Sequence, residues 1–173
     1  MKWLMLDFDG VINGGMHYEK WCEEHSLDFA RNAPERLFFI VEECRARVLS
    51  IVEKTGCKVV WTSSWRHYCQ RSRLVESIVK EVWTAFGFQE DMLYSWTPWL
   101  HIGRARHIEI EQWIDEHPEA VGRMVVLDDL PTAEVKDGYR DGLDVKLVQT
   151  SSFTGLTDEN VDEAVRWLNE EGD

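Results

Sequence analysis

The sequence has few of the features that mark secreted, zinc-binding or membrane-spanning proteins. Its 173 residues include only four cysteines and four prolines, and the cysteines form no CxxC pair. We therefore expect neither a zinc site nor a disulfide framework, but reduced thiols in a cytoplasmic protein. No apolar run approaches the ~18 residues of a membrane span, and the apolar start of the chain reaches Asp7 too early for a signal peptide. The six histidines form no HxH or HExxH pattern, so we assign none of them.

Positive charge is also scarce. The chain has 19 Lys and Arg against 32 Asp and Glu, which gives a net charge of −13. Such an excess works against strong non-specific binding to nucleic acid and against binding to an anionic membrane. The acidic excess does not conflict with binding of a nucleic acid end at a local site. The remaining composition is globular, and the length fits one domain over residues 1–173.

Strand-like and helix-like segments alternate along the chain. Four apolar runs are typical of buried strands, at residues 3–8, 58–64, 123–129 and 144–150. Four segments have apolar residues at helical spacing, at 35–56, at 68–86, at 104–117 and after the expected N-cap Thr157. Residues 10–34 have room for one short helix, and 87–103 are expected to be irregular. The alternation predicts a three-layer, Rossmann-like α/β fold, a parallel sheet with helices on both faces.

Polar side chains follow three of these strands at the point where each strand ends. They are Asp7 and Asp9, Thr62 and Ser63, and Asp128 and Asp129. Parallel strands bring their carboxyl ends to one edge, where ligands of open α/β sheets bind. The sequence therefore predicts four carboxylates and two hydroxyls at a single site.

Carboxylates at close quarters repel one another unless a cation lies among them. Oxygen ligands suit a hard divalent ion, and Mg²⁺ in turn indicates a phosphorylated substrate. A carboxylate can attack phosphorus as a nucleophile, and a second carboxylate can then act as general acid and base. Strand-end hydroxyls and a basic side chain can hold the phosphoryl oxygens.

These motifs resemble those of the haloacid dehalogenase (HAD) superfamily of phosphohydrolases. LDFDGVIN at 6–13 is similar to its DxDG opening motif, KVVWTSSWR at 58–66 to its second motif, and VVLDD at 125–129 to its acidic fourth motif. The segments TSSWR, GRARHIEIEQWI and TSSFTGLT resemble more closely a compact group of the superfamily. That group includes HAD domains of nucleic acid repair proteins.

The resemblance implies a role for each motif residue. Asp7 would be the nucleophile and a Mg²⁺ ligand, and Asp9 the general acid and base, with its backbone carbonyl also on the metal. Thr62 would bind the phosphoryl group, with Ser63 as its rival. Arg106 would be the cation of the third motif, with Arg104 as its rival. Asp128 would be a further metal ligand, and Asp129 would bind the metal directly or through water.

The arginines and the aromatic residues near the motifs each have two possible interpretations. Arg66 could contact the substrate or form a surface salt bridge. Arg104 and Arg106 could be solvated residues of a first helical turn, although the helix dipole disfavours cations there. The aromatic side chains of the 87–103 loop could be core or could stack a nucleobase; they are Tyr94, Trp96 and Trp99.

The spacing between the motifs leaves no room for a large cap domain, so we expect an open site. Such a site suits a nucleotide, a nucleic acid end or another phosphomonoester, contacted locally by arginines among Arg66, Arg71, Arg73, Arg104 and Arg106. The leading hypothesis is a Mg²⁺-dependent phosphatase that forms a phosphoaspartate on Asp7. A phosphomutase, a non-catalytic metal- or phosphate-binding module and an aspartyl-phosphate receiver are the alternatives.

Overall fold

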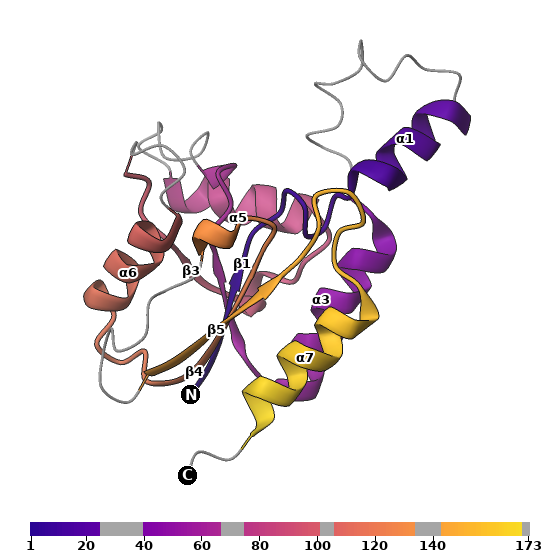
Figure 1. Ribbon diagram of the computed structural model, residues 1–173. Coiled ribbons are helices and arrows are strands. Elements are labelled where there is room, and N and C mark those ends of the chain that lie inside the picture. Colours follow the sequence, from indigo (N-terminus) through magenta and orange to yellow (C-terminus); the bar gives the residue numbers. More distant parts are fainter. Residues whose placement is uncertain (25–39, 67–74, 101–105, 134–142, 171–173) are drawn as a thin grey trace.

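The computed structural model describes residues 1–24, 40–66, 75–100, 106–133 and 143–170. All its named strands belong to one sheet of five, in the spatial order β3-β2-β1-β4-β5 (Figure 1). The strands are β1 (Lys2–Leu6), β2 (Lys58–Trp61), β3 (Leu93–Trp96), β4 (Gly122–Asp128) and β5 (Leu143–Gln149). Every neighbouring pair is parallel. The three strands that carry the sequence motifs, β2, β1 and β4, are therefore adjacent at the centre.

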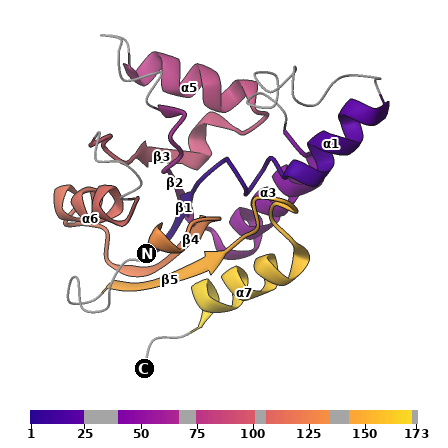
Figure 2. The ribbon, with the colours of Figure 1, turned by 45° about the horizontal axis from the view of Figure 1, so that its top comes forward.

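Helices cover both faces of this sheet. The described helices are α1 (Gly15–Glu24), α3 (Glu42–Thr55), α5 (Val75–Ala85), α6 (Arg106–Glu116) and α7 (Asp158–Asn169), with short 3-10 turns η1 (Glu90–Met92) and η2 (Pro131–Ala133). Helix α6 lies across the sheet from α3 and α7 (Figure 2). The expected three-layer, Rossmann-like α/β fold is confirmed, and no cap domain is evident within the described ranges.

Alternating side chains of β1 supply the two halves of the core. Leu4 and Leu6 join the cluster formed with α3, α5 and α7. Trp3 and Met5 point the other way and join the cluster formed with α6. All four are fully buried, as expected for a central parallel strand covered on both faces.

Two helix ends follow the local signals in the sequence. Gly56 ends α3 in the left-handed conformation, with φ of 66°, which costs glycine no steric strain. Thr157 caps α7: its hydroxyl accepts from the backbone N–H of Asn160, whose side chain accepts from the Thr157 N–H. This reciprocal pair is a capping box and confirms the expected N-cap.

Two expectations about the elements were wrong. Strand β3 lies in the stretch expected to be irregular; it has four residues at the sheet edge, too few to show a period against the surrounding aromatic residues. Helix α3 starts at Glu42, because Val41 is extended. The expected helical residues 35–39, 68–74 and 104–105 lie outside the described ranges.

The described helices include none that is long and apolar enough to span a bilayer. Cys22, Cys44 and Cys57 are free and buried, while Cys69 is outside the described ranges.

Candidate active site

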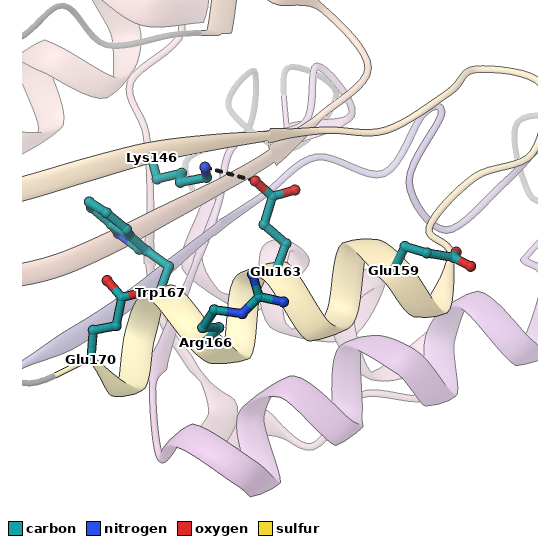
Figure 3. A pocket seen from close by; sticks show the side chains of 6 residues that line it. All are labelled: Lys146, Glu159, Glu163, Arg166, Trp167 and Glu170. Carbon is teal, nitrogen blue, oxygen red and sulfur yellow. Dashed lines mark ion pairs between the residues drawn. The ribbon is translucent and has the colours of Figure 1, made fainter.

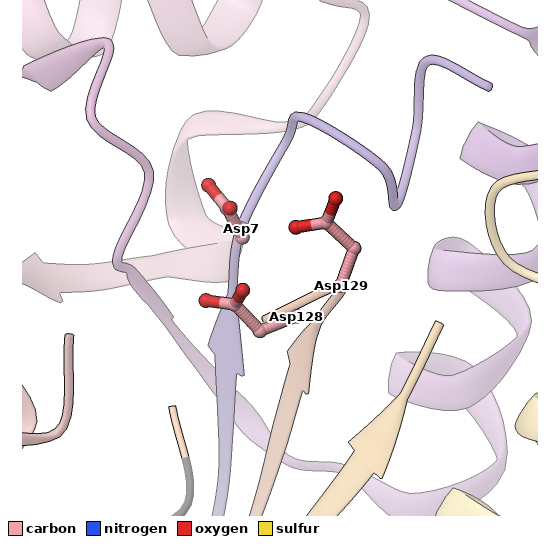
Figure 4. A group of neighbouring side chains, drawn as sticks. All are labelled: Asp7, Asp128 and Asp129. Atoms are coloured by element: carbon pink, nitrogen blue, oxygen red, sulfur yellow. The ribbon is translucent and has the colours of Figure 1, made fainter. Parts of the chain in front are cut away.

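Three carboxylates meet at the carboxyl ends of β1 and β4. Asp7, Asp128 and Asp129 each offer an oxygen, and these oxygens lie within 4.8 Å of one another (Figure 4). The sheet hydrogen bonding continues past the strand end, since the Asp7 N–H donates to the Leu127 carbonyl at 3.0 Å. Pairing of β1 with β4 therefore fixes the separation of the carboxylates.

Arg106, the first residue of α6, is the cation of this cluster. Its Nη2 lies 3.2 Å from Oδ2 of Asp7, and its Nε lies 3.3 Å from Oδ2 of Asp128. The guanidinium is nearly buried, so these contacts are weakly screened by solvent. Among the described residues, Arg106 is the arginine that pairs with this group, and it reaches two of the three carboxylates, which leaves excess negative charge in a buried place.

The pKa values of all three carboxyl groups are raised. Burial raises the pKa of Asp7, against the opposing effect of Arg106. Burial and the charge of Asp7 raise the pKa of Asp128 to about 7. Burial and the charges of Asp7 and Asp9 also raise the pKa of Asp129. For Arg106, burial lowers the pKa, but the neighbouring carboxylates outweigh it, so the pKa is raised and the side chain stays charged.

The donor set fits a hard divalent cation. It consists of carboxylate oxygens only, and Oδ2 of Asp128 is buried without accepting a hydrogen bond in the described part of the chain. Mg²⁺ is commonly held by one or two carboxylates with waters and substrate phosphate completing its shell. Besides burial, repulsion between the carboxylates raises these pKa values, and a cation here would relieve that repulsion.

The two predicted hydroxyls follow β2, the neighbour of β1 on its other side. Thr62 is fully buried, and its Oγ1 has no hydrogen-bond partner among the described residues. Ser63 is already engaged, because its side chain hydrogen bonds to Asp7 and lowers the pKa of that carboxyl. A buried hydroxyl without a partner is costly unless a ligand uses it.

The Asp9 carboxylate stands outside the three-carboxylate group and is held by two donors. Nδ2 of Asn13 donates to Oδ1 at 2.8 Å, and Nε1 of Trp65 donates to Oδ2 at 2.8 Å. Oδ1 of Asn13 also accepts from the Gly10 N–H at 2.9 Å. Asn13 and Trp65 lie in the first two motifs, but no pattern in the sequence predicts a role for them.

The first motif has an apolar residue, Phe8, between its two aspartates and a small residue, Gly10, after them. The structure shows a reason for each. The Phe8 ring is buried, 5.0 Å from both the Trp61 and Phe86 rings, and anchors the loop. Gly10 has φ of 71°, and a Cβ there would lie 2.6 Å from the side chain of Asp129. The loop can therefore approach Asp129 only with glycine at this position.

Arg66 is fully buried, and its described contacts are internal. Nε donates to the Thr97 carbonyl at 2.8 Å, and Nη2 donates to the Pro98 carbonyl at 3.1 Å and pairs with Glu109. Nη1 donates to the carbonyls of Thr62 and Ser63. Burial lowers the pKa of Arg66 to about 10, against the opposing effect of Glu109, so it is charged at neutral pH.

Arg66 thus ties the ends of β2 and β3 to α6, and direct contact with substrate stays a prediction. Glu109 was missed by the sequence analysis, although it lies one helical turn after Arg106. The rival third-motif residue Arg104, with Arg71 and Arg73, lies outside the described ranges.

Two of the aromatic residues expected in a loop, Tyr94 and Trp96, lie in β3; Trp96 is partly buried and Tyr94 is 43% exposed. Trp96 contacts the larger core cluster. The Tyr94 ring meets that of Trp3 edge-on at 4.9 Å, and its hydroxyl donates to Glu119 at 2.7 Å. Both rings contact the core, and stacking of a nucleobase stays a prediction.

Two surface hollows lie away from the strand ends. One, of about 320 Å³, runs along α7 and β5 (Figure 3). Its Lys146 and Glu163 pair at 2.7 Å, and its Trp167 is covered by Arg123 from the start of β4. The other lies between α3 and α7 and includes Arg47, which pairs with Asp158 at 2.7 Å. Neither contains the carboxylate cluster.

Comparison with known proteins gives one family match. A family model described as the HAD domain in Swiss Army Knife RNA repair proteins matches residues 3–161, which include every motif discussed above. No curated protein and no solved structure matches the chain.

Proposed function

Because the chain belongs to the family of HAD domains in Swiss Army Knife RNA repair proteins, we propose that it is a Mg²⁺-dependent phosphomonoester hydrolase acting on nucleic acid ends or nucleotides. The observation that carries the proposal is the Asp7, Asp128 and Arg106 cluster at the ends of adjacent strands. It combines a nucleophile, a cation and metal ligands in one place, as phosphoryl transfer requires.

In this proposal Asp7 and Asp128 would hold Mg²⁺, together with the Asp9 backbone carbonyl and with Asp129 directly or through water. Bound there, the ion would neutralise negative charge on the phosphoryl group and on the carboxylates. Arg106 would keep Asp7 in place and share the charge of the phosphoryl oxygens. The Thr62 hydroxyl would donate to one of those oxygens, a role supported by its burial without a partner. Ser63, engaged with Asp7, is less available for it.

The reaction takes two steps on these side chains. An oxygen of Asp7 attacks phosphorus, the bond from phosphorus to the leaving oxygen breaks, and Asp9 gives that oxygen a proton. Asp9 then takes a proton from water as the water oxygen attacks phosphorus, and the bond to Asp7 breaks. Inorganic phosphate leaves, and both carboxyl groups return to their starting forms.

Two observations support a large substrate. No cap domain is evident over the site in the described residues, so a polynucleotide end could reach it. The family occurs in RNA repair proteins, which favours a terminal phosphate of RNA. With a net charge of −13, we propose that contact with nucleic acid is confined to the site and its nearest arginines.

The test is release of phosphate, with Mg²⁺ or with EDTA, from an aryl phosphate, mononucleotides, and RNA and DNA oligonucleotides bearing 3′- or 5′-phosphates. Asp7→Asn removes the nucleophile with almost no change of shape, and the exposed Asp162→Asn on α7 is the matched control. We expect Mg²⁺-dependent release that Asp7→Asn abolishes and Asp162→Asn leaves unchanged. Full activity of Asp7→Asn would refute the nucleophile, and no release from any substrate would favour a binding module.

A further inference from the structure

Trp65 lies where the second motif meets the first. It follows β2 by four residues, and its backbone N–H donates to the Ser63 hydroxyl at 3.4 Å. Its ring is 8% exposed and packs edge-on against Phe86 at 5.4 Å and against Phe8 at 6.5 Å. The ring is therefore fixed, and so is the direction of its N–H.

That N–H donates to Oδ2 of Asp9 at 2.8 Å, while Asn13 donates to Oδ1 at the same distance. A carboxylate with one fixed donor on each oxygen is restricted in both side-chain torsions. Asp9 is only partly buried, so without these donors packing alone would not select one orientation. The two donors come from different strand-end loops, and Asn13 is itself held by the Gly10 N–H.

We infer that Trp65 is a positioning residue, whose indole N–H together with Asn13 presets the carboxylate of Asp9 for proton transfer to the leaving oxygen. The inference rests on the proposed function, since it assigns a purpose to the orientation of the proposed general acid. During the reaction the proton moves between Asp9 and the leaving oxygen or water, and Trp65 loses and gains none. Orientation of this kind matters because a small misplacement of a catalytic group slows the reaction strongly.

The kinetic test uses Trp65→Phe, which keeps an aromatic ring but removes the N–H. Trp83→Phe is the matched control: Trp83 belongs to the same aromatic cluster, and its N–H donates to the Gln89 carbonyl at 2.9 Å instead. General acid catalysis supplies about 10²–10⁴-fold, and mainly to poor leaving groups, so we expect Trp65→Phe to lower kcat for an alkyl phosphate about 10-fold or more. For a nitrophenyl phosphate, whose leaving group needs little protonation, we expect a loss below about 3-fold and little change in KM.

A spectroscopic test reads the contact without using activity. The nine tryptophans of ¹⁵N-labelled protein should give nine indole N–H signals, and the signal missing from Trp65→Phe identifies Trp65. Asp9→Ala should shift that signal and leave the signal of Trp83 in place. This measurement still decides the contact if Trp65→Phe folds poorly.

The outcomes separate this inference from the proposed function. Equal losses on both phosphates, no loss on either, the same split in Trp83→Phe, or an unmoved Trp65 signal in Asp9→Ala would each overturn the positioning role. Wild-type protein that releases phosphate from none of the substrates, oligonucleotides and mononucleotides included, would refute the proposed function and with it the catalytic meaning of the contact. The NMR spectra would then still show whether Trp65 holds Asp9.

Discussion

The burial and mutual repulsion of the clustered carboxylates should make the metal-free protein lose stability as the pH rises. Burial and the charge of Asp7 raise the pKa of Asp128 from 3.8 to about 7. Between these two values the folded protein binds a proton at Asp128 that the unfolded chain has released. The contribution of Asp128 to the free energy of unfolding is therefore fully present below its pKa in the unfolded chain. It is lost as the pH rises through its pKa in the folded protein.

The size of the effect follows from the same shift. Each pH unit inside the window changes the free energy of unfolding by about 1.4 kcal/mol, so the interval from roughly pH 5.5 to pH 7 removes about 2 kcal/mol. Above pH 7 this contribution changes little. Asp128→Asn cannot ionise and should lack this part of the pH dependence.

The assay is urea unfolding in EDTA at roughly pH 5.5 and roughly pH 8, with wild type and Asp128→Asn side by side. Because histidines and other carboxylates titrate in both proteins, the decisive quantity is the difference between the two at each pH. Wild type should lose about 2 kcal/mol relative to Asp128→Asn, while exposed Asp162→Asn should follow wild type. A difference that does not change with pH, or that changes in the opposite direction, would refute the reasoning.

Mg²⁺ should reverse this loss, because it binds the ionised carboxylates. At a concentration 100 times its dissociation constant, a ligand of the folded state adds about 2.7 kcal/mol. We expect stabilisation of wild type at the higher pH and much less in Asp128→Asn. Equal stabilisation of the two proteins would mean that the ion binds elsewhere.

Two further substitutions test the supports of the site. Glu109→Gln leaves the buried charge of Arg66 without its counter-ion and should cost about 3 kcal/mol in urea unfolding; a loss under about 1 kcal/mol, the value of an exposed pair, would contradict this. Gly10→Ala places a Cβ 2.6 Å from the side chain of Asp129. It should weaken Mg²⁺ binding about 10–100-fold in calorimetry, as displaced supporting groups do, and unchanged affinity would show that Asp129 does not take part.

The central fold and the location of the site could be predicted because both depend on short-range signals. Buried strands such as 3–8 are apolar runs with abrupt polar ends, and parallel strands bring those ends to one edge. The register of β1 with β4 then places Asp7 beside Asp128. Strand β3 could not be found in this way, since three of its four residues are half-buried, Tyr94 is exposed, and the strand shows no clear period at the sheet edge.

The contacts that support the site could not be predicted. They join residues that are far apart in the sequence, and residues of these types can face substrate, solvent or the core. Arg66 would look the same in the sequence whether it faced substrate, solvent or a buried carboxylate, and only the packing of α6 brings Glu109 to it. Trp65 was equally ambiguous, since most tryptophans of this chain are core. Its 2.8 Å contact with Asp9 spans 56 positions.

These contacts explain how the fold tolerates a site that destabilises it. In the described part of the chain, three buried or half-buried carboxylates share one paired arginine, so at neutral pH the cluster itself favours unfolding when no metal is bound. The loops that carry them are also held by interactions that do not involve those carboxylates. Phe8 is fixed among aromatic rings between the two aspartates of the first motif, and Arg66 holds the carbonyls that follow β2. Neutralising a carboxylate and removing a support should therefore change stability in opposite directions. That contrast separates residues placed for chemistry from residues placed for folding.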